Sequence, residues 1–478
     1  MTITVNTQSD FTMTIDGQGV AGAATVAVID PSCEETFARA PDCSANELDH
    51  AVAAARRAFK PWAALSIAQR RDQLLALPKA LMEHIAELAE LLSREQGKPL
   101  KDAQFEIGGT AHWLGAQAML DLPVNVTEDT AERRSETRRV PIGVVAALSP
   151  WNFPVLLGWW KVMPALLAGN TVLLKPSPFT PLTSLKIGEI VRDLLPPGVL
   201  NVISGGDGLG PMLTAHPGID KISFTGSTQT GQLVMASAAA GLKRVTLELG
   251  GNDAAIVLPD VDVKAVASRI FWSAFINNGQ TCIAIKRLYV HRDIYAAMAN
   301  ALADVARSVK VGPGHEAGVQ LGPLQNRRQF ERVCALIDDA RSQGHRFLIG
   351  GEVPASPGYF VPVTLVDNPP DDARVVTEEA FGPVLPLLKF TDIDEAVARA
   401  NDSPYALGAS VWSGDVAAAR AVAERLDAGT VWINEAAYLN PATPLCGHKQ
   451  SGIGTENGVE GLLEYTLPRT LSVCHAAS

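Results

Sequence analysis

From Val140 onward the chain alternates short apolar runs with stretches of helical periodicity, and this alternation limits the folds open to it most strongly. Short strand-like runs rich in apolar residues occupy 143–148, 171–174, 199–203, 221–224 and 244–249, and the first of them is continuously apolar. Helical stretches such as 181–194 and 208–215 lie between them. Apolar runs without a polar alternation are typical of strands buried on both faces, as in a parallel sheet covered by helices. The pattern predicts a doubly wound α/β unit.

A second unit of the same kind begins near residues 254–257. It contains predicted helices at 263–277, 292–308, 326–343 and 416–426, with strands at 384–390, 409–412 and 430–434. A chain of 478 residues has room for about three domains at ~150 residues each. The fold class predicted is therefore α/β with two Rossmann-type domains.

The N-terminal part differs from both units. Residues 1–45 are expected to form short strands and turns. Helices are predicted at 45–59, with Ser44 as N-cap, at 67–96 and at 102–120; Lys60-Pro61-Trp62 separates the first two, and Gly97-Lys98-Pro99 ends the second. Gly and Pro at these places are typical helix stop signals.

The segment 121–139 is rich in Thr, Glu and Arg and has no helical period. Its composition favours a solvated loop. A hairpin arm that pairs with another subunit is the alternative. Residues 461–478 return to β-favouring side chains.

Composition excludes several classes of partner. A formal net charge of −11 disfavours binding to nucleic acid or to an anionic membrane. Six scattered cysteines without C-x-x-C spacing indicate neither a zinc site nor a disulfide framework. No signal peptide is indicated at the N-terminus and no membrane span along the chain, so we expect a cytoplasmic protein.

One cysteine stands on a turn. Asn277-Asn278-Gly279-Gln280-Thr281-Cys282 lies between the apolar runs 270–276 and 283–290. Taken alone, Cys282 is best interpreted as a packed thiol, because free cysteine is among the most buried residue types. A turn can also present a thiol to a ligand.

Two strand ends carry features suited to an anionic ligand. Phe224-Thr225-Gly226-Ser227 ends a strand and opens a helix, and Lys175-Pro176-Ser177 follows another strand. A helix N-terminus favours anions, and ligands bind at the carboxyl ends of strands in such sheets. An ordinary N-cap at Ser227 and a solvated Lys175 are the alternatives.

Two further strand ends carry polar side chains among apolar ones. Asn152, in Pro150-Trp151-Asn152-Phe153-Pro154, offers an amide donor of the kind an oxyanion hole needs. Glu248, in Leu247-Glu248-Leu249-Gly250-Gly251, is a candidate general base, because desolvation raises the pKa of a carboxyl group. A helix cap at Asn152 and an ion pair at Glu248 are the alternatives.

Together these motifs resemble the aldehyde dehydrogenase superfamily. The segments 224–227, 247–251 and 279–282 match in order, and 34 residues separate Glu248 from Cys282. Further matches are 150–154, Glu379-Ala380-Phe381-Gly382-Pro383, 429–434 and 447–452. The similarity covers essentially the whole chain. Within this superfamily the chain could resemble the bacterial geranial dehydrogenases, whose substrate is a terpenoid aldehyde.

The resemblance implies roles for individual residues. Cys282 would attack the aldehyde to give a thiohemiacetal, and Asn152 with the Cys282 N–H would hold its oxyanion. Transfer of hydride to NAD(P) leaves a thioester, which a water activated by Glu248 would hydrolyse. Lys161 and Glu456 match a pair that relays protons from this base.

The resemblance also implies a cofactor site. The matching residues are Trp151, Lys175, Ser177, Gly205, Gly226, Ser227, Leu249, Gln329, Glu379 and Phe381. Pro178 stands where NAD-preferring members carry a Glu that binds the adenosine ribose, so nothing there repels a 2′-phosphate and NADP stays open. We favour NAD. Asn252 replaces the usual Lys after Gly-Gly.

By the same alignment the substrate pocket is lined mainly by apolar side chains. The positions are Phe153, Leu156, Leu157, Trp160, Ile276, Thr281, Ile283, Tyr438, Leu439 and Leu445. Without Arg or Lys in this set, a substrate carboxylate would be buried unpaired. We therefore expect an aromatic, medium-chain or terpenoid aldehyde. Cys446, beside the expected pocket, is interpreted as a packed residue.

The resemblance finally assigns domains and assembly. Residues 1–120 and 140–249 would bind the dinucleotide, and 250–460 would carry the nucleophile. Residues 121–139 and 461–478 would form an oligomerisation arm of a homodimer or homotetramer, in place of the loop that composition favours. The competing functions are a coenzyme A-acylating semialdehyde dehydrogenase and a catalytically silent structural or binding protein on the same scaffold.

Overall fold

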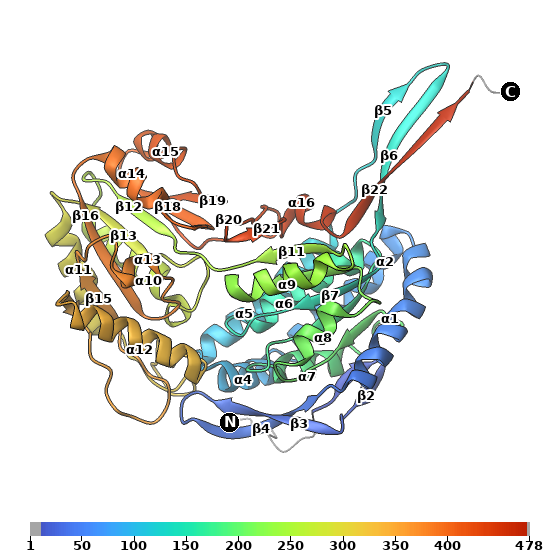
Figure 1. Cartoon of the computed structure of the whole chain (residues 1–478), viewed down its shortest axis with the longest axis horizontal. Helices are drawn as coiled ribbons and strands as arrows, with labels where there is room; N and C mark the ends of the chain where they lie inside the picture. Colours follow the sequence, from blue (N-terminus) through green and yellow to red (C-terminus); the bar gives the residue numbers. More distant parts are fainter. Residues whose placement is uncertain (1–10, 476–478) are drawn as a thin grey trace.

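The fold is built around two largely parallel sheets that lie side by side (Figure 1). They are seen in a computed structural model that describes residues 11–475. The predictions for residues 1–10 and 476–478 lie outside this range. Within it the α/β class predicted from the alternating pattern is confirmed.

The first sheet carries the strands predicted between 143 and 249. Its spatial order is β2 (Gln18–Val20), β1 (Met13–Ile15), β9 (Leu200–Val202), β8 (Thr171–Lys175), β7 (Val144–Leu148), β10 (Lys221–Thr225), β11 (Arg244–Glu248) and β21 (Gly452–Ile453). The strands from β9 to β11 run parallel. Every residue of β7, β8 and β10 is buried, as expected where helices cover both faces of a sheet.

Helices precede and alternate with these strands. They are α1 (Ala45–Ala64), α2 (Ile67–Leu74), α3 (Ala76–Glu83), α4 (Ile85–Gln96), α5 (Leu100–Ala118), α6 (Pro154–Leu167), α7 (Leu182–Ile190), α8 (Leu209–Ala215) and α9 (Thr228–Ala239). Strands β3 (Ala24–Asp30) and β4 (Glu35–Asp42) form a separate hairpin.

The second sheet is built from the second alternating unit. Its order is β14 (Arg346–Ile349), β15 (Thr364–Asp367), β16 (Val384–Phe390), β13 (Arg287–His291), β12 (Ala254–Val257), β18 (Gly408–Trp412) and β19 (Thr430–Ile433). All neighbours are parallel except β14 and β15. The associated helices are α10 (Val263–Phe275), α11 (Tyr295–Ser308), α12 (Arg327–Ser342), α13 (Arg374–Thr377), α14 (Ile393–Asn401) and α15 (Val416–Ala423).

After β19 the chain returns to the first sheet and then leaves the body. Strand β20 (His448–Lys449) pairs with β17 (Tyr405–Ala406), β21 joins the edge of β11, and α16 (Gly458–Leu463) follows. Strand β22 (Thr466–Cys474) then pairs with the hairpin β5 (Asn125–Asp129) and β6 (Arg133–Pro141) in an arm that projects from the body (Figure 1). The loop that composition favours for 121–139 is therefore wrong, and the hairpin is correct.

Two helix predictions need correction. The helix predicted over 67–96 is divided into α2, α3 and α4, because the chain tightens at His84, whose N–H donates to Leu81 O three residues back. The helix predicted to end before Lys60 continues through Pro61 to Ala64. Burial of Trp62, whose indole N–H donates to Leu166 O at 3.0 Å, offsets the hydrogen bond that Pro61 cannot make.

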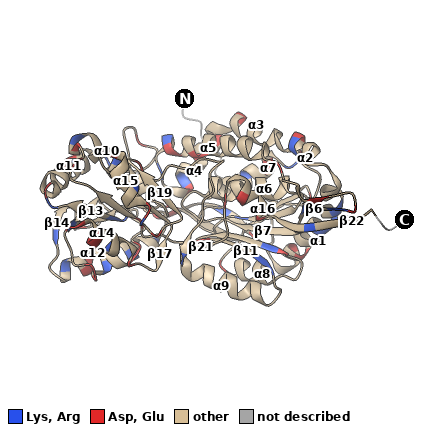
Figure 2. Ribbon diagram, turned by 90° about the horizontal axis from the view of Figure 1, so that it is seen from above, with Lys and Arg blue, Asp and Glu red and all other residues tan. Residues whose placement is uncertain are grey.

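Charged side chains of both signs are scattered over both halves of the ribbon (Figure 2). In residues 11–475 no helix is long and apolar enough to cross a bilayer.

Candidate active site

Cys282 follows a turn with an unusual backbone. Helix α10 ends at Phe275, and Asn277, Asn278 and Gly279 then adopt φ values of 51°, 59° and 74°. Asn tolerates this left-handed region better than other side chains, and Gly enters it without strain. At position 279 only Gly fits, because a Cβ would lie 2.2 Å from Gly382 O. The sequence Asn-Asn-Gly thus sets the direction in which the chain reaches the cysteine.

Gln280 fixes the turn from inside. Its amide N–H donates to Asn277 O at 2.9 Å, and its amide oxygen accepts the N–H of Gln325 at 2.9 Å. The Thr281 hydroxyl donates to Ile276 O at 3.3 Å. The side chains of Gln280 and Thr281 therefore hold the turn that presents Cys282.

Asn152 lies directly against this turn. It is buried, and its Nδ2 donates to Gln280 O at 2.9 Å. Its own carbonyl oxygen accepts Asn277 Nδ2 at 3.0 Å. An amide nitrogen carries two N–H bonds, so one remains for a ligand beside Cys282. The predicted oxyanion donor and the predicted nucleophile are thus brought together.

A buried ion pair that the sequence reading missed also holds Asn152. Lys98 Nζ lies 2.6 Å from Glu106 Oε2 and donates to Asn152 O at 2.9 Å. Glu106 Oε1 accepts the N–H groups of Val155 and Leu156 at 3.0 and 3.2 Å, at the start of α6. The sequence signal was Gly97-Lys98-Pro99, interpreted there as a helix stop alone.

Glu248 ends β11 and is buried. Burial, followed by the charge of Glu456, raises its pKa well above the usual value, while Lys161 opposes this. Its Oε1 accepts no hydrogen bond from the described residues. The charge of Glu248 acts on the thiols of both Cys282 and Cys446. An acid so placed keeps its proton to a higher pH than an exposed carboxyl group does, which suits a proton acceptor in acid–base chemistry.

The Cys282 thiol is partly exposed in an otherwise buried neighbourhood. Burial raises its pKa to about 12. The Lys286 charge lowers this pKa, and the carboxylates of Glu248, Asp253 and Glu379 raise it. A thiol in this setting needs a base to become a nucleophile.

Lys161 and Glu456 form a buried ion pair. Glu456 also accepts the Ser223 hydroxyl at 3.4 Å, and Tyr465 OH donates to Ser223 Oγ at 3.0 Å. Both members of the pair act electrostatically on Glu248. The pair predicted from the resemblance is therefore formed and lies within range of the candidate base.

Six of the ten predicted cofactor residues lie at or just after the ends of β8, β9, β10 and β11, at the carboxyl edge of the first sheet. Lys175 ends β8 and Ser177 follows it, Gly205 follows β9, Gly226 and Ser227 follow β10, and Leu249 follows β11. Ser227 caps α9, since its Oγ accepts the Thr230 N–H at 3.2 Å. The ordinary N-cap weighed for Ser227 is thus present.

Lys175 fits a ligand with hydroxyl groups. It is buried, and its ammonium donates to Pro176 O at 3.1 Å. Burial lowers its pKa to about 8, against the charge of Asp207. An ammonium has three N–H donors, so donors remain for the ribose hydroxyls of a dinucleotide.

The other predicted cofactor residues are Trp151, which follows β7 at the same edge, and three residues from the second half of the chain. Trp151 and Phe381 pack edge to face with ring centroids 5.3 Å apart. Gln329 Nε2 donates to the Phe381 carbonyl at 3.0 Å. Glu379 Oε1 accepts the Gly251 N–H at 3.1 Å and lies 3.5 Å from Lys286 Nζ. The Glu379 carboxylate could accept hydrogen bonds from ribose hydroxyls, and the aromatic rings could lie against a nicotinamide.

Most predicted pocket residues pack together beside the cysteine. One buried cluster contains Phe153, Leu156, Leu157, Trp160, Leu439 and Leu445. A second cluster contains Cys282, Ile283 and again Leu439, which therefore joins the thiol to the first cluster. Ile276 and Tyr438 are exposed and lie outside both clusters.

Sequence reasoning missed other members of these clusters. Trp113 of α5 belongs to the first, and its indole N–H donates to Asn457 Oδ1 at 2.8 Å. Leu407 and Trp432 belong to the second. No motif marks Trp113 or Leu407, whereas Trp432 lies in the matching segment 429–434, which does not indicate which residues it contacts.

Comparison with known proteins agrees with this arrangement. Residues 20–471 match the model of the aldehyde dehydrogenase family. The chain is 43% identical to a probable aldehyde dehydrogenase of Pseudomonas sp., an alignment that covers 97% of this chain and 95% of that protein. It is 40% identical to a phenylacetaldehyde dehydrogenase of Pseudomonas fluorescens, covering 97% and 96%.

Solved structures agree with the sequence comparison. The NAD⁺ complex of an aldehyde dehydrogenase from Bacillus cereus superposes with a TM-score of 0.93 at 36% identity, covering 98% of this chain and 97% of that one. Similarity of this extent includes both sheets and the arm. The chain therefore belongs to the aldehyde dehydrogenase family.

Proposed function

We propose that this aldehyde dehydrogenase oxidises an apolar aldehyde to its carboxylic acid with NAD, through covalent intermediates on Cys282. The observation that carries the proposal is the grouping of four features at one point. Cys282 stands on a fixed turn, Asn152 is hydrogen-bonded to that turn, the charge of Glu248 reaches the thiol, and an apolar cluster adjoins it.

Glu248 takes the thiol proton, and the sulfur of Cys282 bonds to the aldehyde carbon. The negative charge that develops on the aldehyde oxygen is held by the free N–H of Asn152 and the N–H of Cys282. Removing such a donor costs ~3–4 kcal/mol of transition-state stabilisation in comparable enzymes.

The oxidised nicotinamide, when bound, supplies the two-electron acceptor that removes the hydrogen of the aldehyde carbon. Cys282 then holds the carbon as a thioester. Glu248 deprotonates a water that attacks this carbon, and the acid leaves as the thiol is restored. Lys161 and Glu456 would carry the proton away from Glu248.

The cofactor would be held at the carboxyl edge of the first sheet. Lys175, with Ser177 and Gly205 nearby, would take the adenosine ribose, and Gly226, Ser227 and Leu249 would flank the dinucleotide. Gln329, Glu379 and Phe381 with Trp151 would position the nicotinamide end. We favour NAD; NADP is the alternative, because Pro178 provides no carboxylate to repel a 2′-phosphate.

The substrate proposed is aromatic, medium-chain or terpenoid. The cluster around Leu439 is apolar, and the ammonium of Lys98, which lies above the Phe153 ring, is already paired with Glu106. A substrate carboxylate would therefore be buried without a free partner. The aromatic choice agrees with the name of the relative from Pseudomonas fluorescens.

The domain roles follow from the sheets. Residues 1–120 and 140–249 would bind the dinucleotide, and 250–460 would carry the nucleophile. The arm of β5, β6 and β22 would join subunits into a dimer or tetramer. Val126, Leu471 and Val473 on the arm expose 42–51% of their surface, which favours burial against a partner.

A steady-state assay across an aldehyde panel, run with NAD and with NADP, tests the proposal. We expect kcat/KM for octanal, benzaldehyde or geranial to exceed that for succinate semialdehyde by at least about tenfold, the cost of leaving one charge poorly paired. The opposite order would contradict the pocket assignment.

The acylating alternative is distinguished by the product. Relatives that transfer the acyl group to coenzyme A lack the base at the position of Glu248, so we expect free acid with or without coenzyme A. Formation of an acyl-coenzyme A thioester would favour the alternative. Absence of any NAD(P) reduction across the panel would favour a silent scaffold.

A further inference from the structure

A lysine that no motif singled out lies between the candidate nucleophile and the candidate cofactor site. Lys286 is buried just before β13. Its Nζ donates to Cys282 O at 2.5 Å and to Ala284 O at 3.4 Å. The same Nζ lies 3.5 Å from Glu379 Oε1. One ammonium therefore touches the residue that carries the thiol and the carboxylate expected to hold the nicotinamide ribose.

A buried ammonium is costly unless carboxylates and hydrogen-bond acceptors surround it. Lys286 has two carbonyl oxygens and Glu379 in contact, and the charge of Asp253 acts in the same neighbourhood. These groups come from the cysteine segment, from the loop before β12 and from the loop before β16. Acceptor oxygens and carboxylates from three segments therefore surround the Lys286 ammonium.

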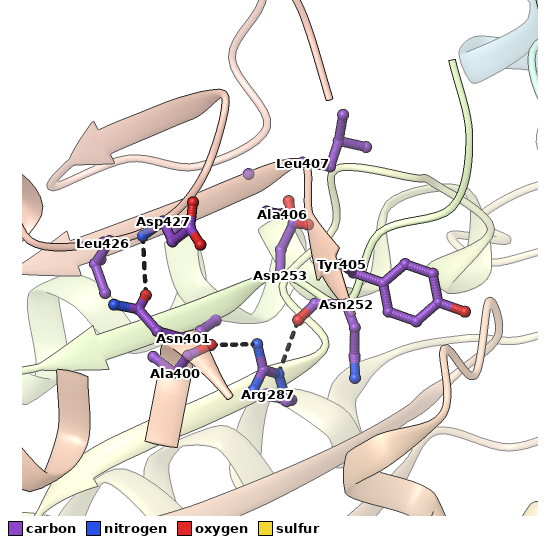
Figure 3. A pocket seen from close by; sticks show the side chains of 13 residues that line it. Asn252, Asp253, Arg287, Ala400, Asn401, Tyr405, Ala406, Leu407, Leu426 and Asp427 are labelled. Carbon is purple, nitrogen blue, oxygen red and sulfur yellow. Dashed lines mark hydrogen bonds between the residues drawn. The ribbon is translucent and has the colours of Figure 1, made fainter. Parts of the chain in front are cut away.

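Asp253, on whose carboxyl group the charge of Lys286 acts, lines a small cavity. The cavity has a volume of about 10 Å³ and is lined by Asp253, Asn252, Arg287 and Tyr405, among others (Figure 3), which is room for about one water. The guanidinium of Arg287 is turned away from the thiol, since it donates to Asn252 O and Ala400 O at 2.8 and 2.9 Å. Lys286 is thus the cation with a contact to Cys282.

Asn252 makes this lysine distinctive. At position 252 the family pattern has a lysine, whereas here the side chain is neutral and donates to Val376 O at 2.8 Å. Lys286 lies 34 residues further along the chain. Its ammonium is paired with the Glu379 carboxylate, and the same carboxylate accepts the Gly251 N–H, so Lys286 provides the positive charge near Gly250-Gly251.

We infer that Lys286 is a positioning residue of the dehydrogenase centre, which holds the Cys282 backbone and the Glu379 carboxylate in fixed relation and supplies the positive charge nearest the thiol. The inference rests on the proposed function of Cys282 and Glu379. It assigns to this chain a link between nucleophile and cofactor that its motifs do not contain.

Two consequences follow from the position of the ammonium. At the thiol, the charge of Lys286 favours the thiolate, whereas Glu248, Asp253 and Glu379 oppose it. At Glu379, loss of the ammonium frees the side chain to turn away from the ribose. Removing the charge should therefore slow thiolate chemistry and raise the KM for NAD together.

The test compares Lys286→Met with Lys243→Met. Lys243 is a matched control, because its ammonium also donates to two backbone carbonyls, Thr214 O and His216 O, at the opposite end of β11. The readout is the rate of Cys282 alkylation by iodoacetamide in the NAD-free enzyme between pH 7 and 9, followed by mass spectrometry of the labelled peptide. It does not depend on dehydrogenase turnover.

We expect alkylation at least about tenfold slower in Lys286→Met, since each unit by which a thiol pKa rises costs a factor of ten in thiolate. Lys286→Arg should restore much of the rate, and Lys243→Met should match the wild type.

If Lys286→Met does not fold, Glu379→Gln replaces it. Removing a carboxylate that opposes the thiolate should speed alkylation of Cys282. Unchanged alkylation in folded Lys286→Met, or in Glu379→Gln when it is the variant measured, would overturn the inference.

Failure of the proposed function would look different. Cys282→Ala would then keep its aldehyde-dependent NAD reduction, whatever the alkylation data show for Lys286.

Discussion

At the scale of single residues, the site depends on charges held out of water. Glu248, Lys161 and Glu456 are buried together, and the Cys282 thiol lies within the fields of Lys286 and three carboxylates. In such surroundings each charge alters the protonation of its neighbours strongly. The reactivity of the thiol is therefore set by the neighbourhood as a whole.

The thiol should show this in its pH dependence. Because burial raises the pKa of Cys282 to about 12, its thiolate fraction should rise about tenfold per pH unit through pH 7–10. We expect iodoacetamide labelling of Cys282 in the NAD-free enzyme to rise across that range without levelling off. A plateau below pH 9 would contradict this prediction, because it would place the pKa of the thiol below about 9.

The main candidate residues of the site could be predicted from the sequence, but the hydrogen bonds and ion pairs that hold them could be predicted only in part. Asn152, Glu248 and Cys282 stand in recognisable motifs at strand ends and on a turn. Glu106 and Lys286 stand in no motif, and the segment around Lys98 indicates only a helix stop. The hydrogen bond from Lys98 to Asn152 spans 54 residues and that from Trp113 to Asn457 spans 344, so neither can be predicted from local sequence.

At the scale of elements, α6 is the support of the oxyanion donor. Its first N–H groups are capped by Glu106, and Lys98 joins Glu106 to the carbonyl of Asn152. A carboxylate at a helix N-terminus also interacts favourably with the helix dipole. The position of Asn152 therefore depends on a charge in α5.

Glu106→Gln tests this dependence. It leaves Lys98 buried without a counter-charge, which costs about 3–5 kcal/mol when one partner of a buried pair is removed. We expect a clear fall in Tm together with a fall in kcat of at least about tenfold, measured by calorimetry and by steady-state assay.

Glu95→Gln is the matched control. Glu95 is also buried and accepts two helix N–H groups, those of Leu182 and Thr183, at 2.8 and 2.9 Å. Its side chain contacts α7 instead of the Asn152 loop, so its kcat should stay near that of the wild type. Equal losses of kcat in both variants would contradict a specific role for Glu106.

Most helices and parallel strands were predictable at this scale, whereas breaks and short strands were not. The division of 67–96 into α2, α3 and α4 arises at Leu75 and His84, where neither Gly nor Pro stands. Strand β21 is only Gly452–Ile453 and is specified by its pairing with Leu247 and Glu248. Tertiary contacts decide such elements, so local propensity does not reveal them.

At the scale of the whole molecule, the arm exposes apolar side chains and long stretches of strand to solvent. Along β22, Pro468 to Cys474 are exposed, and the hydroxyls of Ser472 and Thr470 pair only with β6 across the arm. Isolated ribbons of few strands are marginally stable in water. A partner subunit would bury this surface, in keeping with the proposed assembly.

Leu471→Asp combined with Val473→Asp tests that role. Two charges on this face should disrupt an interface that buries it, because an unpaired buried charge is strongly unfavourable. We expect light scattering with size-exclusion chromatography to show a smaller species than the wild type. Val416→Asp, an exposed position on α15 far from the arm, should keep the wild-type mass, and unchanged mass in the arm variant would contradict an interface there.

The covalent role of Cys282, with Glu248 as the base that releases the product, is tested most directly by mass spectrometry of Glu248→Gln. This variant keeps the shape of the side chain and loses its basicity, so hydrolysis of the thioester should slow more than its formation. After mixing with NAD and benzaldehyde, we predict a benzoyl adduct on the peptide that contains Cys282, with about one equivalent of NADH formed per active site in the first turnover. A variant that turns over without an adduct, or that carries the adduct on another residue such as Cys446, would contradict the account.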